Sequence, residues 1–194
     1  MQASYVIWAR DIIEGACSLD AMTGFKDDWQ LLDGISLSGS FPVSAQLRFD
    51  PDDRTGIKLT DSLYNADQLI VASDRLKALL ESVKAPRLEY FPIPVFNHKK
   101  RQIAEPYWII HPLQPVDCLV IDACEPRWGR IDKTNIDRLK HFVVDEARID
   151  PARLLFRPKY YNSAILAHRS LAQKIDAAGM TGVRWIELSD YPEE

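Results

Sequence analysis

The chain has 194 residues, of which 46% are hydrophobic and 27% are charged, and this composition is ordinary for a globular protein with a hydrophobic core. Its formal net charge of -4 argues against a surface that binds a nucleic-acid backbone, and the basic run at residues 98–101 predicts only a solvated loop. No apolar run approaches the roughly 20 residues of a membrane-spanning helix, and Arg10, Asp11 and Glu14 come too early for a secretory signal peptide. We therefore expect one cytoplasmic domain over residues 1–194.

Residues 1–62 form the less regular part of the chain. Residues 4–9 are rich in β-forming side chains and predict an opening strand. Glycine and proline then interrupt the pattern repeatedly, so we expect loops, one short helix near residues 27–32 and a strand around residues 45–49. Residues 49–56 have the acidic density of a calcium loop but lack its terminal glutamate, which predicts a polar turn.

Two segments near residues 68–95 and 163–190 share a pattern of strand, helix and strand, and they align at a constant offset without a gap. In the first segment, apolar residues recur at the spacing of one helical face, and Ser73 is placed to cap that helix. We interpret the two segments as a duplicated strand-helix-strand unit, whose crossover is long enough for its two strands to pair in parallel. The apolar positions that align include Leu76 with Leu171, Leu80 with Ile175 and Leu88 with Val183.

The second predicted helix departs from the first at two positions. His168 replaces the capping residue Ser73, and Lys174 replaces Leu79 on the apolar face. These replacements predict a second helix that is more exposed and less well capped than the first.

A pair of glycines, Gly179 and Gly182, follows the second predicted helix. A phosphate-binding loop places its glycines before a helix, so that free N–H groups point at the anion. The first segment carries Lys84 and Arg87 at the aligned positions, so a ligand of both units would not need glycine there. We interpret Gly179 as the left-handed residue that ends the helix and Gly182 as part of the turn into the next strand.

Between the two segments, residues 106–125 are apolar enough for a buried strand, which two prolines interrupt. We expect a strand, a bend and a second short strand at residues 118–122. Further along, residues 139–145 and 152–160 predict an antiparallel hairpin. The predicted fold class is therefore α+β, with a mixed, mainly antiparallel sheet and few helices.

The cysteines do not have the spacing of a metal site or of a disulfide framework, and we expect Cys17, Cys118 and Cys124 to be reduced and buried. A nucleophilic set of Cys118, His111 and Asp117 is disfavoured, because neighbours on a strand point to opposite faces. No hydrolase, phosphate-binding, zinc-protease or dinucleotide motif occurs. We expect no catalytic residue, no cofactor and no metal; a small hydrolase that uses Cys118 or His111 is the alternative hypothesis.

Two polar segments carry tryptophan beside carboxylates, one near the predicted first helix and one in a loop flanked by proline and glycine. Tryptophan in a polar loop is costly to leave in water, and it often anchors a protein partner, although it closes over the core equally often. The contact candidates are Asp27, Asp28, Trp29, Asp122, Glu125 and Trp128.

Two blocks of the sequence resemble the immunity-protein-eleven family of bacterial polymorphic toxin systems. The first block is residues 106–125. The second, more specific block is residues 154–188, where a Phe-Arg-x-x-x-Tyr strand starting at Phe156 precedes a strand, a helix, a Gly-x-x-Gly and a strand. The resemblance covers residues 63–188, with a weaker match at the amino end.

This resemblance implies an immunity protein that binds and neutralises a cognate toxin of a secretion system, and the family supplies no catalytic residues. Mild acidity suits a basic toxin. The resemblance gives no reason to expect nucleic acid or membrane as a partner, and nothing in the sequence indicates a homo-oligomer. A structural or regulatory role without a toxin is the third hypothesis.

Overall fold

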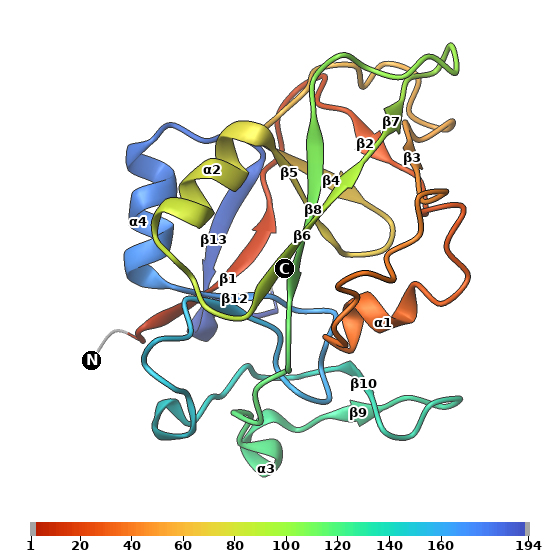
Figure 1. Cartoon of the computed structure of the whole chain (residues 1–194). Coiled ribbons are helices and arrows are strands. Elements are labelled where there is room, and N and C mark those ends of the chain that lie inside the picture. Colours follow the sequence, from red (N-terminus) through yellow and green to blue (C-terminus); the bar gives the residue numbers. More distant parts are fainter. Residues whose placement is uncertain (1–2, 193–194) are drawn as a thin grey trace.

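The computed structural model describes residues 3–192, and most of its regular structure is β-strand. Figure 1 shows two helices on one side of the strands and two short strand pairs at the edges of the molecule. The helices within the described part of the chain are α1 (Trp29–Leu32), α2 (Asp74–Ser82), α3 (Ile121–Cys124) and α4 (Arg169–Ala177), with 3-10 turns at Glu146–Arg148 and Leu188–Asp190.

The first sheet contains both ends of the chain. Its strand order is β11 (Leu155–Phe156), β12 (Leu166–His168), β1 (Tyr5–Arg10) and β13 (Val183–Glu187), and all of its pairs are antiparallel. The aromatic and β-branched residues of β1 place this strand at the centre of the sheet, so the predicted opening strand is confirmed.

The second sheet contains the middle of the chain. Its order is β2 (Ser18–Leu19), β4 (Ser62–Asn65), β5 (Ile70–Ser73), β8 (Tyr107–Pro112) and β6 (Leu88–Ile93). The β2–β4 pair is parallel and the other three pairs are antiparallel. The α+β class with a mainly antiparallel sheet is therefore confirmed.

Two further strand pairs extend from these sheets. A short parallel pair joins β3 (Leu47–Arg48) to β7 (Val95–Phe96), so the strand expected around residues 45–49 is present. A short antiparallel hairpin joins β9 (Arg127–Trp128) to β10 (Ile136–Arg138).

Both predicted strand-helix-strand units are present, but their strands do not pair with each other. In the first unit, β8 lies between β5 and β6 and is antiparallel to both. In the second unit, β1 lies in the same way between β12 and β13. Direct parallel pairing was thus a wrong prediction, because a strand from outside the unit lies between the two strands of each unit. The two units share this topology, and their duplication stays a prediction.

The two units meet in one hydrophobic cluster. The inward faces of α2 and α4 pack against strands of both sheets, and each fully buried leucine or isoleucine there stabilises the fold by roughly 1.5–3 kcal/mol. Its most buried members include Val6, Ile70, Leu76, Leu80, Ile110, Leu155, Leu171 and Ile175. A second cluster lies under β2, β3 and β7, and a third lies beside β1 and the chain around Phe142.

The prediction of an exposed, poorly capped second helix was wrong. Ser73 caps α2 as expected, accepting from the Leu76 N–H at 3.2 Å. The His168 Nδ1 atom accepts from the Ser170 N–H at 3.2 Å and caps α4 in the same way. The helix α4 also buries three residues, whereas α2 buries two. Lys174 is not buried, but Ala172 is buried beside Leu171 and Ile175 on the apolar face of α4.

Gly179 has the predicted left-handed conformation, with φ at +62°. Its N–H donates to Asp176 and the next N–H donates to Ile175, which is the hydrogen-bond pattern of a glycine-terminated helix. Gly182 is also left-handed, and a Cβ atom there would lie 2.2 Å from the Ser62 carbonyl oxygen. The glycine pair therefore ends a helix and lets two chain segments approach closely.

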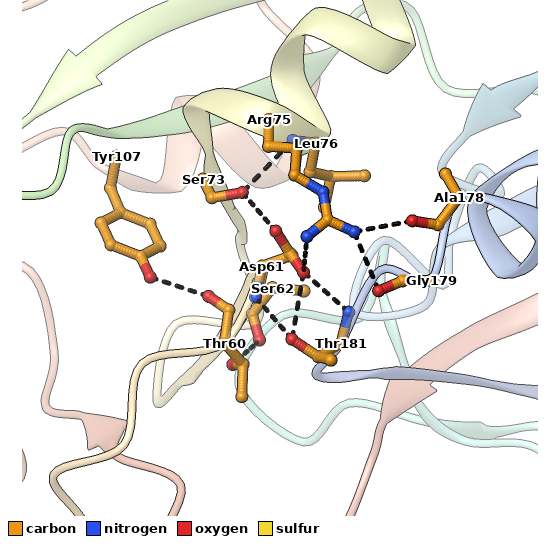
Figure 2. A network of polar contacts seen from close by, with 10 residues as sticks. All are labelled: Thr60, Asp61, Ser62, Ser73, Arg75, Leu76, Tyr107, Ala178, Gly179 and Thr181. Atoms are coloured by element: carbon orange, nitrogen blue, oxygen red, sulfur yellow. Dashed lines mark hydrogen bonds and ion pairs between the residues drawn. The ribbon is translucent and has the colours of Figure 1, made fainter.

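A polar network joins the two units beside this glycine pair, as Figure 2 shows. The Asp61 carboxylate accepts from the Ser73 hydroxyl and from the Thr181 N–H and hydroxyl, at 2.8–3.0 Å. Arg75 of α2 donates to the two carbonyl groups that directly follow α4, those of Ala178 and Gly179. The first residues of α2 are thereby tied to the end of α4.

The interpretation of the chain between the units was partly wrong. Residues 118–122 do not form a strand and lead into α3. Residues 139–145 and 152–160 do not form a hairpin: β11 pairs with β12, and the hairpin of this region is β9–β10. The apolar residues that suggested a strand, Leu139 and Phe142, are buried in the core from irregular chain.

Candidate functional site

A groove of about 480 Å³ lies between the chain that follows α1 and the β9–β10 hairpin. Figure 1 shows α1 next to this hairpin, at a distance from α2 and α4. We call this groove the hairpin groove. The residues that line it include Asp33, Ile35, Asp132, Asn135, Tyr160 and Asn162.

The hairpin loop is ordered by one carboxylate. Asp132 accepts from the N–H and hydroxyl of Thr134 and from the Asn135 side chain, and these bonds hold its pKa below the usual range. The N–H of Gly129 closes the loop by donating to the Asn135 carbonyl at 2.9 Å. The loop therefore presents its side chains from a defined backbone.

Exposed large apolar side chains are concentrated on the two segments that border the hairpin groove, and one of them, Ile35, lines it. The described part of the chain has eight exposed large hydrophobic side chains in all, and four of these belong to α1, the segment after it or the hairpin. Ile131 is fully exposed at the hairpin loop, and Trp29 is 52% exposed on α1. The other two are Ile35 and Trp128. A concentration of apolar side chains on polar segments is typical of a surface that binds a protein.

The wall of the groove opposite α1 consists of aromatic and polar contacts. Trp128 packs edge-on against Tyr160, with ring centroids 6.0 Å apart. Lys159 lies over the Tyr160 ring at 4.7 Å. Across the groove, the Asn162 side chain donates to Asp33 at 2.8 Å and links this wall to the end of α1.

Arg157 supports this wall from inside the protein. The side chain is buried and donates to the Asn162 carbonyl at 2.5 Å and to the Gln68 carbonyl at 2.8 Å. Burial without a neighbouring carboxylate lowers the pKa of Arg157 to about 10. The guanidinium thus holds the groove wall onto the turn between β4 and β5.

His111 supports the α1 side in the same way. Its Nε2 atom lies 2.8 Å from the Ile35 carbonyl oxygen, and the ring packs near Phe91. Burial lowers the pKa of His111, and its Nδ1 atom has no hydrogen-bond partner among the described residues. The imidazole is therefore neutral at pH 7 and donates to Ile35, which positions the chain beside the groove.

The contact candidates chosen from the sequence occupy two locations. Trp29 and Trp128 lie on the two segments that border the hairpin groove, and Asp27 and Asp28 directly precede α1. Asp122 and Glu125 lie at α3, where Glu125 pairs with Lys140 at 2.8 Å and does not reach the groove lining. Of the four exposed hydrophobic residues on these segments, the sequence did not indicate Ile35 and Ile131. The signal for Ile131 was an isoleucine flanked by Arg130 and Asp132 in a turn.

The cysteines are buried and free, as expected. Burial raises the pKa of Cys118 to about 12 and that of Cys17 to about 11, which opposes formation of a nucleophilic thiolate. No hydrogen bond joins Cys118 to His111 within residues 3–192. Between those limits, no cluster of three or more His, Cys, Asp or Glu residues could hold a metal ion, and no helix is long and apolar enough to cross a membrane.

The model of a family described as an immunity protein family, Imm11, matches residues 10–190. This range includes α1, the hairpin and both strand-helix-strand units. No curated protein matches the chain.

Proposed function

The chain belongs to the immunity protein family Imm11, and we propose that it binds a cognate bacterial toxin directly and neutralises it without catalysis. The family match suggests immunity against a toxin. The observation that supports direct contact is the group of exposed apolar side chains around the hairpin groove. The Asp27 and Asp28 carboxylates beside Trp29 add a negative rim, which would steer a basic toxin toward this surface.

Ile131 is the proposed central anchor of this surface. Its side chain is fully exposed in the free protein, and the loop that carries it is already ordered. Burial of one isoleucine side chain contributes roughly 1.5–3 kcal/mol, which places Ile131 in the range of residues that dominate interfaces. An ordered loop also loses little conformational entropy on binding.

The test uses the toxin encoded beside the gene for this chain, expressed in sensitive cells. The wild-type protein is expected to rescue growth and to co-purify with the toxin. The variant Ile131→Glu is expected to bind at least 100-fold more weakly, because it would bury an unpaired charge. Ile12→Glu is the matched control, since Ile12 is 84% exposed and lies outside α1, the segment after it and the hairpin.

The possible outcomes separate the function from the surface. Absence of rescue and of a complex with the wild-type protein would contradict the immunity function. Full rescue and unchanged affinity with Ile131→Glu would leave the function standing and reject the hairpin groove as the contact surface. Thermal unfolding of both variants checks that the fold is retained, because changes at exposed positions alter stability by only about 0.5 kcal/mol.

A further inference from the structure

A second cavity, of about 580 Å³, lies beside the β3–β7 pair. We call this cavity the basic pocket. In Figure 1 the β3–β7 pair lies toward the opposite end of the molecule from the β9–β10 hairpin. The side chains that give the pocket its charge are those of Arg48, Arg54 and Lys100, with Asp20 as the one carboxylate in the lining.

The three cations have no anionic partner within residues 3–192. Among the described residues, no ion pair and no side-chain hydrogen bond involves Arg48, Arg54 or Lys100. His98 also lines the pocket, and its Nε2 atom is buried without a hydrogen-bond partner. A surface that collects three unpaired cations within a protein of net charge -4 favours an anionic ligand.

The backbone around the basic pocket is held in place before any ligand binds. Asn97 accepts from the N–H groups of Lys99 and Arg101 and holds the Lys100 residue in a left-handed conformation, with φ at +57°. A non-glycine residue persists in this unfavourable conformation only where its surroundings hold it, so the hydrogen bonds of the loop determine its backbone. On the other side, Asp53 accepts from the Gly56 N–H and orders the loop that carries Arg54.

An apolar groove of about 270 Å³ adjoins the basic pocket. The two cavities share the side chains of Phe49, Asn97 and His98. Ile57, which is 67% exposed, forms part of the apolar lining. A ligand that fills both cavities must therefore combine a negative group with a neighbouring apolar group.

We infer that the basic pocket and its apolar neighbour receive an acidic residue and an adjacent apolar residue of the toxin, as a second contact apart from the hairpin groove. This inference rests on the proposed function. Arginine side chains hydrogen-bond a carboxylate in paired geometry, and Arg48 and Arg54 both line the basic pocket. The local charge of this contact is opposite to the overall charge of the protein, so the toxin surface must present acidic residues here.

The test compares two charge-reversed forms of the full chain. The variant R48E/R54E reverses the charge of the pocket. The variant K84E/K174E reverses two exposed lysines that form no ion pair with any described residue and line neither cavity. Both variants have the same net charge, so long-range effects cancel in the comparison. R48E/R54E is expected to slow association with the toxin at least tenfold at low salt, and K84E/K174E less than threefold. The neutral pair R48Q/R54Q and K84Q/K174Q serves if charge reversal prevents folding.

A titration followed by NMR identifies the ligand chemistry. The dipeptide N-acetyl-Asp-Leu-amide is expected to shift the resonances of His98 and Ile57, and N-acetyl-Asn-Leu-amide is expected to shift them much less. Stronger shifts with inorganic phosphate than with the aspartyl dipeptide would overturn the acidic residue as the occupant. Equal toxin binding by the wild type and R48E/R54E would overturn the second contact and leave the proposed function standing. Absence of toxin binding by the wild type would overturn the proposed function, on which the second contact rests.

Discussion

The two glycines after α4 allow a matched test of how the two units are joined. Both have positive φ, at +62° for Gly179 and +86° for Gly182. Alanine at either position adopts a left-handed conformation that costs roughly 1–2 kcal/mol. The two positions differ in the space available for a Cβ atom. At Gly179 a Cβ would meet only the Arg75 side chain, at 4.0 Å. At Gly182 it would lie 2.2 Å from the Ser62 carbonyl oxygen and 2.5 Å from the Thr60 hydroxyl oxygen.

The overlap at Gly182 involves backbone and must be relieved by separating the two chain segments. That movement would break the hydrogen bond from the Ser62 N–H to the Thr181 carbonyl, which is 3.0 Å long, and the bonds from Thr181 to Asp61. Each lost bond costs about 1 kcal/mol in addition to the conformational cost. We therefore expect Gly182→Ala to destabilise the protein by about 3–5 kcal/mol and Gly179→Ala by about 1–2 kcal/mol.

Urea unfolding at pH 7, followed by far-ultraviolet circular dichroism, measures both values. For a protein of this size, 1 kcal/mol corresponds to roughly 2–4 °C in Tm, so Gly182→Ala is expected to melt on the order of 10 °C below wild type. Equal losses for the two variants, or a loss below 1 kcal/mol for Gly182→Ala, would refute the close approach as the reason for glycine.

Two further predictions concern buried titratable groups. Burial lowers the pKa of His111, so below the unfolded-state pKa of about 6.5 the unfolded chain binds a proton that the folded protein excludes. The free energy of unfolding of the wild type is therefore expected to fall from pH 7 to pH 5, by up to about 1.4 kcal/mol per pH unit, and that of His111→Gln is expected to fall less. Urea unfolding at these pH values measures both, and equal pH dependence of the two proteins would contradict this. Burial raises the pKa of Cys118 to about 12, so a thiol reagent at pH 8 is expected to modify this residue only after unfolding. Mass spectrometry measures the labelling, and rapid labelling of the folded protein would contradict this.

The strand-helix-strand units could be predicted from the sequence because their signals are local. The apolar face of α2, the Ser73 cap and the helix-ending Gly179 each depend on residues within a few positions. Lys84 and Arg87, which align with the two glycines, also have positive φ, and the sequence did not predict this conformation for them. The entry of β8 and β1 between the strands of each unit could not be predicted, because it depends on contacts between distant segments.

The candidate site was predicted only in part, for a related reason. The β9–β10 strands are two and three residues long and mostly polar, so they have no apolar alternation that would indicate a hairpin. Residues 139–145 have more apolar character, but their apolar side chains fill the core from irregular chain. Tryptophan beside carboxylates indicated Trp29 and Trp128, whereas the exposure of Ile131 depends on a loop conformation that only the structure gives.

The separation of core and surface explains how this fold could change its partner without unfolding. The hydrophobic cluster between the units and the Asp61 network use residues of α2, α4 and the main strands. The hairpin loop is instead ordered by its own residue Asp132, so replacement of Ile131 leaves the core contacts intact. If the hairpin groove is the toxin contact, substitutions that alter toxin recognition should cluster at loop side chains that are exposed in the free protein and make no core contacts. Substitutions at Arg157 and His111 should instead reduce recognition through displacement of the groove walls, with a loss of stability measured in parallel.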